Sequence, residues 1–324
     1  MLQKRQKMLW NWAKRIDNPL QMLYTVGELQ MHGPCKDCAE EIKRRTYIMR
    51  NRIGVIHNLR KALETGDTEL KALGLTCVQL NCWEPDLFTD ENAEILKEKF
   101  SGDVAISSLW IGWTGPRAWN FTEGPLTLGL VPAAYRFQRI QELLKGIAFA
   151  AKLGIENVAT HVGFIPENPN TTEYSELRAA LRTLVTACAN NKIYFNFETG
   201  QETPVTLMRM ISDLGSEYVG INFDPANLIL YGKGNPVDAV SIFGSRIRGI
   251  HVKDGDYPTS FYSLGCERVV GEGSVNFPVF LPKLIRQGYT GDLYIEREIT
   301  GEQQIIDIKR TVAYLEKVLD EVCE

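Results

Sequence analysis

The sequence contains no long apolar segment and no excess of positive charge. Its longest apolar runs, such as residues 127–135, fall well short of the roughly 18–20 residues that a membrane span needs. A formal net charge of −4 gives no electrostatic reason to bind nucleic acid or an acidic membrane surface. The basic N-terminus is not followed by the apolar core and small-residue cleavage site of a signal peptide. We therefore expect a cytoplasmic protein with no nucleic-acid or membrane partner.

Histidine is scarce, and cysteine follows no regular pattern. The seven cysteines are odd in number and irregularly spaced, which does not indicate a disulfide framework, so reduced thiols are expected. The chain has only four histidines, and three of them, His57, His161 and His251, lie at or near the ends of predicted strands. This placement makes them candidates for a functional site.

From about residue 52 onward, short β-branched or aromatic runs alternate with longer amphipathic stretches. The predicted strands are residues 53–57, 76–80, 104–110, 157–161, 193–198, 218–224, 247–253 and 292–296. Eight β-then-α units are typical of a closed (β/α)8 TIM barrel. An open doubly wound sheet would normally carry a glycine-rich phosphate turn after its first strand, and residues 57–60, His-Asn-Leu-Arg, are not such a turn.

Residues 1–48 do not fit this repeat. They are basic and contain tryptophan, and they precede Met49, directly before the first predicted strand. We expect a short N-terminal extension over residues 1–48 and a catalytic barrel domain over residues 49–324. The extension is either an appended arm or an upstream addition to a protein that starts functionally at Met49.

Four consecutive predicted strands carry metal-ligand side chains at their C-terminal ends, the face on which such barrels build active sites. These residues are Glu198, Asp224, His251 and Glu296. Three carboxylates at one mouth are costly unless a cation neutralises them. Three carboxylates and one imidazole suit one divalent ion, Mn²⁺ first, with Mg²⁺, Co²⁺ or Zn²⁺ as alternatives.

Several motifs resemble the xylose-isomerase-like sugar (phosphate) isomerase/epimerase family over roughly residues 52–320. They read THVGFIPENP, NFETGQETP, NFDPANLILYGKG, GIHVKDGDYP, GEGSVNFP and LYIEREITGEQQI. The resemblance implies that Glu198, Asp224, His251 and Glu296 bind the metal. It also implies that Glu198 and Glu296 serve as the acid/base pair of a sugar isomerase or epimerase, which moves a proton next to a carbonyl.

One departure from the family bears on the reaction. Many relatives carry a histidine three residues after the aspartate of strand six, where this chain has Asn227, which cannot act as a base. His161 is therefore a third catalytic candidate. The alternative reaction is β-elimination from 3-oxo-glycosides, as in the catalytic subunits of C-glycoside deglycosidases, which pair with a small second subunit. A metal-dependent endonuclease is disfavoured, because it needs more histidines and a basic face.

Four residues are expected to contact the substrate, a small-molecule sugar or sugar conjugate. His57 ends strand one, Trp113 opens the loop after strand three, and Asn227 follows strand six. Lys253 lies two residues after His251, so strand alternation places it on the same interior side. We also expect the protein to form an oligomer. The identity of the sugar, its phosphorylation, and the choice among isomerisation, epimerisation and elimination stay open at this point.

Overall fold

The structure, a computed structural model, describes residues 51–323 and contains a closed barrel of parallel strands. The barrel strands are β1 (Ile53–Asn58), β2 (Cys77–Cys82), β3 (Ala105–Ile111), β4 (Asn157–Thr160), β5 (Tyr194–Glu198), β6 (Val219–Phe223), β7 (Ile247–Val252) and β10 (Leu293–Ile295). β10 pairs with both β7 and β1 and thereby closes the ring. The predicted (β/α)8 barrel is confirmed.

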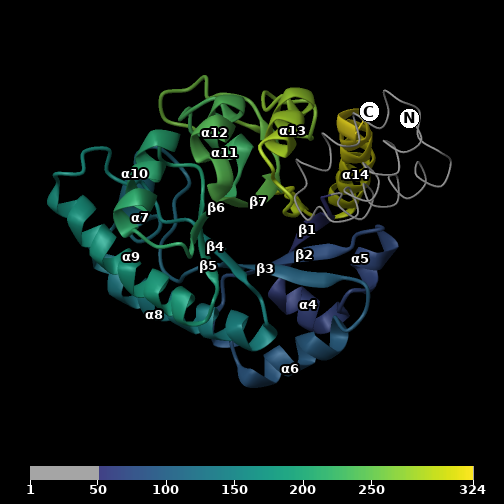
Figure 1. Cartoon of the computed structure of the whole chain (residues 1–324), viewed down its shortest axis with the longest axis horizontal. Helices are drawn as coiled ribbons and strands as arrows, with labels where there is room; N and C mark the ends of the chain where they lie inside the picture. Colours follow the sequence, from purple (N-terminus) through teal and green to yellow (C-terminus); the bar gives the residue numbers. More distant parts are fainter. Residues whose placement is uncertain (1–50, 324) are drawn as a thin grey trace, which may run out of the picture.

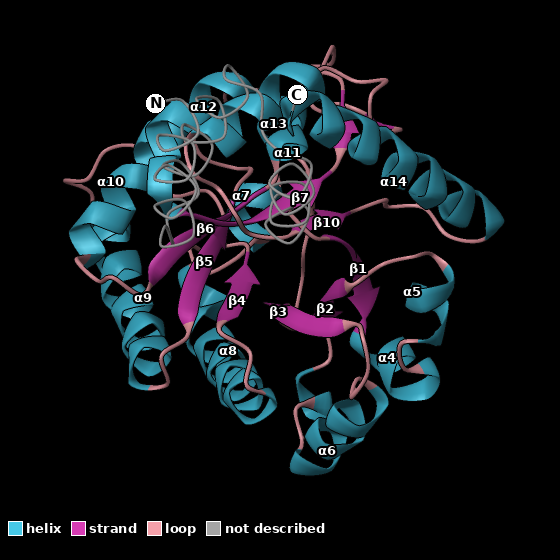
Figure 2. Cartoon of the chain, turned by 45° about the vertical axis from the view of Figure 1, so that its right-hand side comes forward, coloured by secondary structure: helices cyan, strands magenta, loops and turns pink. Residues whose placement is uncertain are grey.

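Helices surround the strands on the outside of the barrel (Figures 1 and 2). They are α4 (Leu59–Thr65), α5 (Thr68–Ala72), α6 (Asp90–Lys99), α8 (Ala133–Leu153), α9 (Thr172–Asn190), α10 (Pro204–Leu214), α12 (Pro236–Phe243), α13 (Phe277–Arg286) and α14 (Glu302–Cys323). No helix within residues 51–323 is long and apolar enough to cross a membrane. The predicted extension, residues 1–48, lies outside the described residues.

Local signals in the sequence set the helix ends. Thr171 caps α9 by accepting a hydrogen bond from the amide of Tyr174, and Thr203 caps α10 with Pro204 at the first helical position. Gly154 and Gly215 end α8 and α10 at positive φ angles of 71° and 63°. These residues therefore determine where the helices begin and end.

Several strands end near, but not at, the predicted residues. β4 ends at Thr160, β6 at Phe223 and β10 at Ile295. His161, Asp224 and Glu296 are therefore each the first residue beyond a strand. The structure also contains elements that the sequence does not predict, namely the short helices α7 (Gly124–Thr127) and α11 (Pro225–Leu230) and the two-residue strands β8 (Asp254–Gly255) and β9 (Glu267–Arg268). α11 begins directly after Asp224, and β8 follows β7, the strand that carries His251, so both elements lie at the mouth of the barrel.

The barrel interior contains buried amides as well as aliphatic side chains. Gln79, Asn196 and Asn222 are each at most 2% exposed. Glycines in the neighbouring strands leave room for them, since a Cβ on Gly220 or Gly249 would lie 2.4 or 2.6 Å from an amide oxygen. This polar layer lies directly beneath the residues at the mouth of the barrel.

Candidate metal centre and active-site cavity

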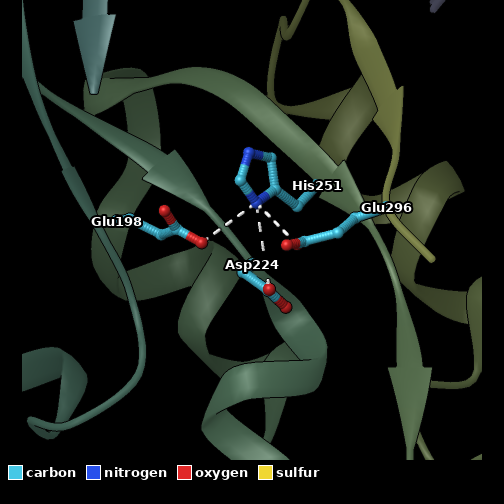
Figure 3. A group of neighbouring side chains, drawn as sticks. All are labelled: Glu198, Asp224, His251 and Glu296. Carbon is cyan, nitrogen blue, oxygen red and sulfur yellow. Dashed lines mark ion pairs between the residues drawn. The ribbon is translucent and has the colours of Figure 1, made fainter. Parts of the chain in front are cut away.

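The structure brings Glu198, Asp224, His251 and Glu296 together at the C-terminal mouth of the barrel (Figure 3). One ligand atom from each residue lies within 4.8 Å of the others. Nδ1 of His251 is 3.0 Å from Oε1 of Glu198, 3.0 Å from Oε2 of Glu296 and 3.9 Å from Oδ2 of Asp224. The two glutamates approach this nitrogen from opposite sides, with the aspartate between them.

These side chains fit a divalent cation. Asp224, His251 and Glu198 are at most 3% exposed. Oδ2 of Asp224, Nδ1 of His251 and Oε2 of Glu296 have no hydrogen-bond partner within residues 51–323. Buried polar atoms without partners are costly, and a bound ion would both satisfy them and neutralise the carboxylates. Three oxygen donors and one imidazole nitrogen match the preferences of Mn²⁺ and similar ions.

Asp224 both caps a helix and faces the cluster. Its Oδ1 accepts a 2.9 Å hydrogen bond from the backbone N–H of Asn227 and so caps the N-terminus of α11. The hydroxyl of Thr199 donates to the carbonyl of Asp224 at 2.8 Å and accepts from its amide at 2.9 Å. The backbone and one carboxylate oxygen are thereby fixed, and Oδ2 is left for the cluster.

The electrostatics of the cluster also favour a cation. Burial lowers the pKa of His251, but Glu198 and Glu296 outweigh it and raise that pKa to about 10. Burial raises the pKa of Asp224 well above its usual range. Burial also acts to raise the pKa of Glu296, but Lys253 and His251 lower it below its usual range. A proton on His251 and a divalent ion would thus compete for the same place.

Trp110 orients one of the ligands. Its indole N–H donates to Oε2 of Glu198, and Oε1 of that carboxylate is left facing His251. Trp110 is the sixth residue of β3 and is 5% exposed. We did not predict this role from the sequence; the available signal was an indole donor near the C-terminal end of a strand.

Lys253 places a buried positive charge beside the cluster, as strand alternation predicts. Its Nζ lies 2.6 Å from Glu298, 3.6 Å from Oε2 of Glu296 and 3.8 Å from Oδ2 of Asp224. Burial lowers its pKa, but Glu296 and the other two carboxylates raise it well above its usual value. The side chain is therefore a permanent cation in the wall of the site.

A cavity of about 380 Å³ opens over the cluster, which is large enough for a small-molecule ligand. Six of the predicted site residues line it: His161, Glu198, Asn227, His251, Lys253 and Glu296. Its remaining walls are formed by Ile56, Asn81, Trp83, Trp110, Trp119, Leu230, Tyr231 and Glu298. Of these, Trp83 and Trp119 were not predicted from the sequence. One end of the cavity is thus polar and charged, and much of the rest is aromatic or aliphatic.

His161 lies in the wall between these two ends. Its Nε2 is 3.4 Å from Oε1 of Glu198. Its ring lies 5.1 Å from the ring of Trp119 and 5.9 Å from that of Trp110, measured between centroids. Burial lowers its pKa, although the nearby carboxylates of Glu198 and Glu296 act in the opposite direction. The imidazole is therefore neutral at neutral pH and is not one of the four clustered ligands.

Two residues expected at the substrate do not line the cavity. Ile56 faces the cavity from β1, so strand alternation turns His57 outward, where the charges nearest to it are Lys61 and Glu69. Trp113 is 1% exposed and packs in a small apolar cluster behind Trp110. The expectation of direct substrate contact is corrected for both: His57 belongs to the strand–helix layer, and Trp113 supports the cavity wall from behind.

Comparison with known proteins places the chain in a family. The model of the xylose isomerase-like TIM barrel family matches residues 68–318. The chain belongs to this family. A solved xylose isomerase domain protein from Planctomyces limnophilus is 31% identical, with a TM-score of 0.80 over 84% of this chain and 99% of that one.

Other known proteins are more distantly similar to the chain. A D-tagatose 3-epimerase-like protein of known structure is 21% identical, with a TM-score of 0.61 over 84% of this chain and 99% of that one, which shows the shared fold. The uncharacterized protein MJ1311 of Methanocaldococcus jannaschii is 27% identical over 203 residues. That match spans 57% of this chain and 64% of the archaeal protein.

Proposed function

We propose that this protein is a divalent-metal-dependent isomerase or epimerase that removes a proton next to the carbonyl group of a sugar or keto-sugar. The observation that carries the proposal is the convergence of Glu198, Asp224, His251 and Glu296 into one cluster, of which Glu198, His251 and Glu296 line a sugar-sized cavity. The D-tagatose 3-epimerase-like protein that shares the fold supports the same class of substrate.

Glu198, Asp224, His251 and Glu296 would hold the ion, with Mn²⁺ as the first choice and Mg²⁺, Co²⁺ or Zn²⁺ as alternatives. When bound, such an ion supplies Lewis-acid polarisation of the substrate carbonyl. Every other requirement of the reaction falls to side chains: a base to take the proton, an acid to return one, and groups that orient the sugar.

Glu198 and Glu296 are suited to the two proton transfers, because they reach the centre of the cluster from opposite sides. A proton removed from one face of a carbon and returned on the other inverts that carbon, which is epimerisation. Lys253 is placed to stabilise negative charge that develops on a substrate oxygen. Asn227 lines the same wall and can hydrogen-bond a sugar hydroxyl.

The aromatic end of the cavity suits the apolar face of a sugar ring or of its substituent. The ring centroid of Trp83 lies 4.7 Å from that of Trp110 and 6.5 Å from that of Trp119, so the three indoles form one continuous wall. Aromatic walls of this kind fix the orientation of a ligand, while a few polar groups select it. The sugar would therefore lie between the indoles and the metal-ligand cluster.

His161 favours a second candidate reaction, the β-elimination of a 3-oxo-glycoside. A neutral imidazole outside the ligand set is a free base beside the cluster. It would take the proton from the carbon next to the ketone as a carbon–carbon double bond forms. The bond to the β substituent would break, and the leaving group would depart with the electron pair and acquire a proton. In that case we also expect a small second subunit, and in either case we expect the barrel to form an oligomer.

The test is proton exchange in D2O. The Mn²⁺-loaded protein is incubated with ketoses, aldoses and 3-oxo-glycosides, and the products are followed by NMR and mass spectrometry. We expect deuterium to enter next to the carbonyl of one class, together with a new isomer or, for elimination, two fragments. A chelator-treated sample should show neither. The absence of exchange and product across all three classes would contradict the proposal.

A further inference from the structure

One ring nitrogen of His251 points away from the metal-ligand cluster, and this nitrogen is hydrogen-bonded to a side-chain amide inside the barrel. Nε2 of His251 lies 2.6 Å from Oε1 of Gln79, across the inside of the barrel from β7 to β2. An amide oxygen only accepts hydrogen bonds, so Nε2 carries the hydrogen and donates it. Nδ1, on the other side of the ring, faces the three carboxylates.

The orientation of the Gln79 amide follows from its other partners. Its Nε2 donates to Oγ of Ser108 at 3.0 Å and to Oδ1 of Asn222 at 3.2 Å. With the Asn222 amide oriented as it is in the structure, a flipped Gln79 amide would turn its oxygen toward Oδ1 of Asn222, so that two acceptors would meet. Gln79, Ser108 and Asn222 are at most 3% exposed, and the polar atoms of the Gln79 amide are fully satisfied by this network.

Strand β7 is built to accommodate this network. A Cβ on Gly249 would lie 2.6 Å from Oδ1 of Asn222, the atom to which Gln79 donates. TIM barrels normally fill their interiors with branched aliphatic side chains. Burying these amides costs desolvation, and Nδ2 of Asn222 has no hydrogen-bond partner among the described residues, so an amide chain placed here that ends on a ligand histidine points to a role at the site.

We propose that Gln79, itself held by Ser108 and Asn222, is a positioning residue that fixes His251 in the tautomer with hydrogen on Nε2, so that Nδ1 is presented as a metal ligand. The inference rests on the proposed function, because it assigns Gln79 a purpose at the metal site. Partners of ligand histidines commonly have this effect, and losing one weakens metal binding about 10–100-fold.

The test compares Mn²⁺ affinities, measured by titration calorimetry, for the whole protein and its variants. Gln79→Leu keeps the size of the side chain and removes the acceptor, and we expect affinity to fall about 10–100-fold. Gln79→Glu restores an acceptor for Nε2. Its second oxygen would accept a hydrogen bond from the Asn222 amide, turned to present the otherwise unpartnered Nδ2, so this variant should recover most of the affinity. The matched control is Asn196→Leu, a change to an interior amide that bonds Asn157 and not the histidine; it should bind Mn²⁺ like the wild type.

A second measurement covers the case in which Gln79→Leu does not fold. Ser108→Ala loosens the Gln79 amide without touching His251 and should weaken binding in the same direction. In the Zn²⁺-loaded wild type, ¹⁵N-labelled histidine should give a His251 signal with hydrogen on Nε2, identified among the four histidines by its loss in His251→Gln. Hydrogen on Nδ1, wild-type affinity in both Gln79→Leu and Ser108→Ala, or an equal loss in Asn196→Leu would overturn the inference. A wild type that binds no divalent ion would instead overturn the proposed function on which it rests.

Discussion

Nε2 of His161 lies 3.4 Å from Oε1 of Glu198, so an imidazole outside the ligand set touches a carboxylate inside it. The pair joins the aromatic wall of the cavity to its charged floor. Because burial keeps His161 neutral, it can take a proton while Glu198 stays engaged as a ligand. Whether His161 acts as the base therefore distinguishes β-elimination from isomerisation or epimerisation.

Replacing His161 with glutamine should distinguish them. If His161 is the base, as we propose for elimination, turnover should fall by the roughly 10²–10⁴-fold typical of a lost general base. Metal content, measured by atomic absorption, should not change. A loss of only about tenfold, or about 1.4 kcal/mol, would assign the proton transfers to Glu198 and Glu296 and leave His161 an orienting role.

Replacing Asp224 with asparagine should remove the metal while keeping the fold. The asparagine side chain can still accept the hydrogen bond that caps α11. For the wild type, a Mn²⁺ concentration about 100 times its Kd should raise the free energy of unfolding by about 2.7 kcal/mol. We expect Asp224→Asn to show little of this gain in urea unfolding. Equal stabilisation of both proteins would place the ion elsewhere.

Replacing Lys253 with methionine should change metal binding and turnover in opposite directions. The ammonium group lies near Oε2 of Glu296 and Oδ2 of Asp224, where it repels a second cation. Its loss should tighten Mn²⁺ binding and lower turnover about tenfold or more, because charge on the substrate is no longer stabilised. Glu298→Gln, which keeps the lysine, is the control and should affect turnover much less. Weaker metal binding in Lys253→Met would indicate a structural role.

His57 should make stability depend on pH. Burial, and then Lys61, lower its pKa from an ordinary value of about 6.5 to about 4, so the unfolded chain takes up a proton that the folded protein excludes. The contribution of the neutral His57 ring to the free energy of unfolding is fully present above about pH 6.5 and is lost as the pH falls through 4. This contribution amounts to up to about 3 kcal/mol.

Urea unfolding of His57→Gln between pH 4 and 7 measures this contribution. The slope of the unfolding free energy against pH should fall by up to about 1.4 kcal/mol per pH unit, which corresponds to one proton. Lys61→Gln removes the cation that, after burial, lowers the pKa of His57; the loss of stability should then be smaller and be complete at a higher pH. An unchanged slope in His57→Gln would show that this ring is not protected from protonation.

A chain that begins at Met49 should fold and bind metal like the full chain. It keeps Asn51, whose side chain donates to the carbonyl of Gly291 at 2.7 Å, and the ion pair of Arg52 with Asp292 at 2.7 Å. It also keeps β1 and its pairing with β10, which closes the barrel. Circular dichroism and Mn²⁺ stoichiometry provide the check. Insoluble protein would show that residues 1–48 contribute to folding.

Much of this protein could be predicted from the sequence. Alternating short strands and amphipathic helices specify a parallel barrel, because each strand must be covered by the helix that follows it. Parallel strands also place their C-terminal ends at one mouth, so strand-ending residues such as Glu198 and Glu296 are expected to meet there. The structure brings them together with Asp224 and His251.

Other contacts were decided only by the tertiary structure. A shift of one residue at a strand end reverses the direction of a side chain, and this is why Ile56 rather than His57 faces the cavity. The bond from Trp110 to Glu198 joins residues 88 positions apart, and that from His251 to Gln79 joins residues 172 apart. No local pattern encodes such pairs, because they depend on how strands far apart in sequence are registered and face one another across the closed barrel.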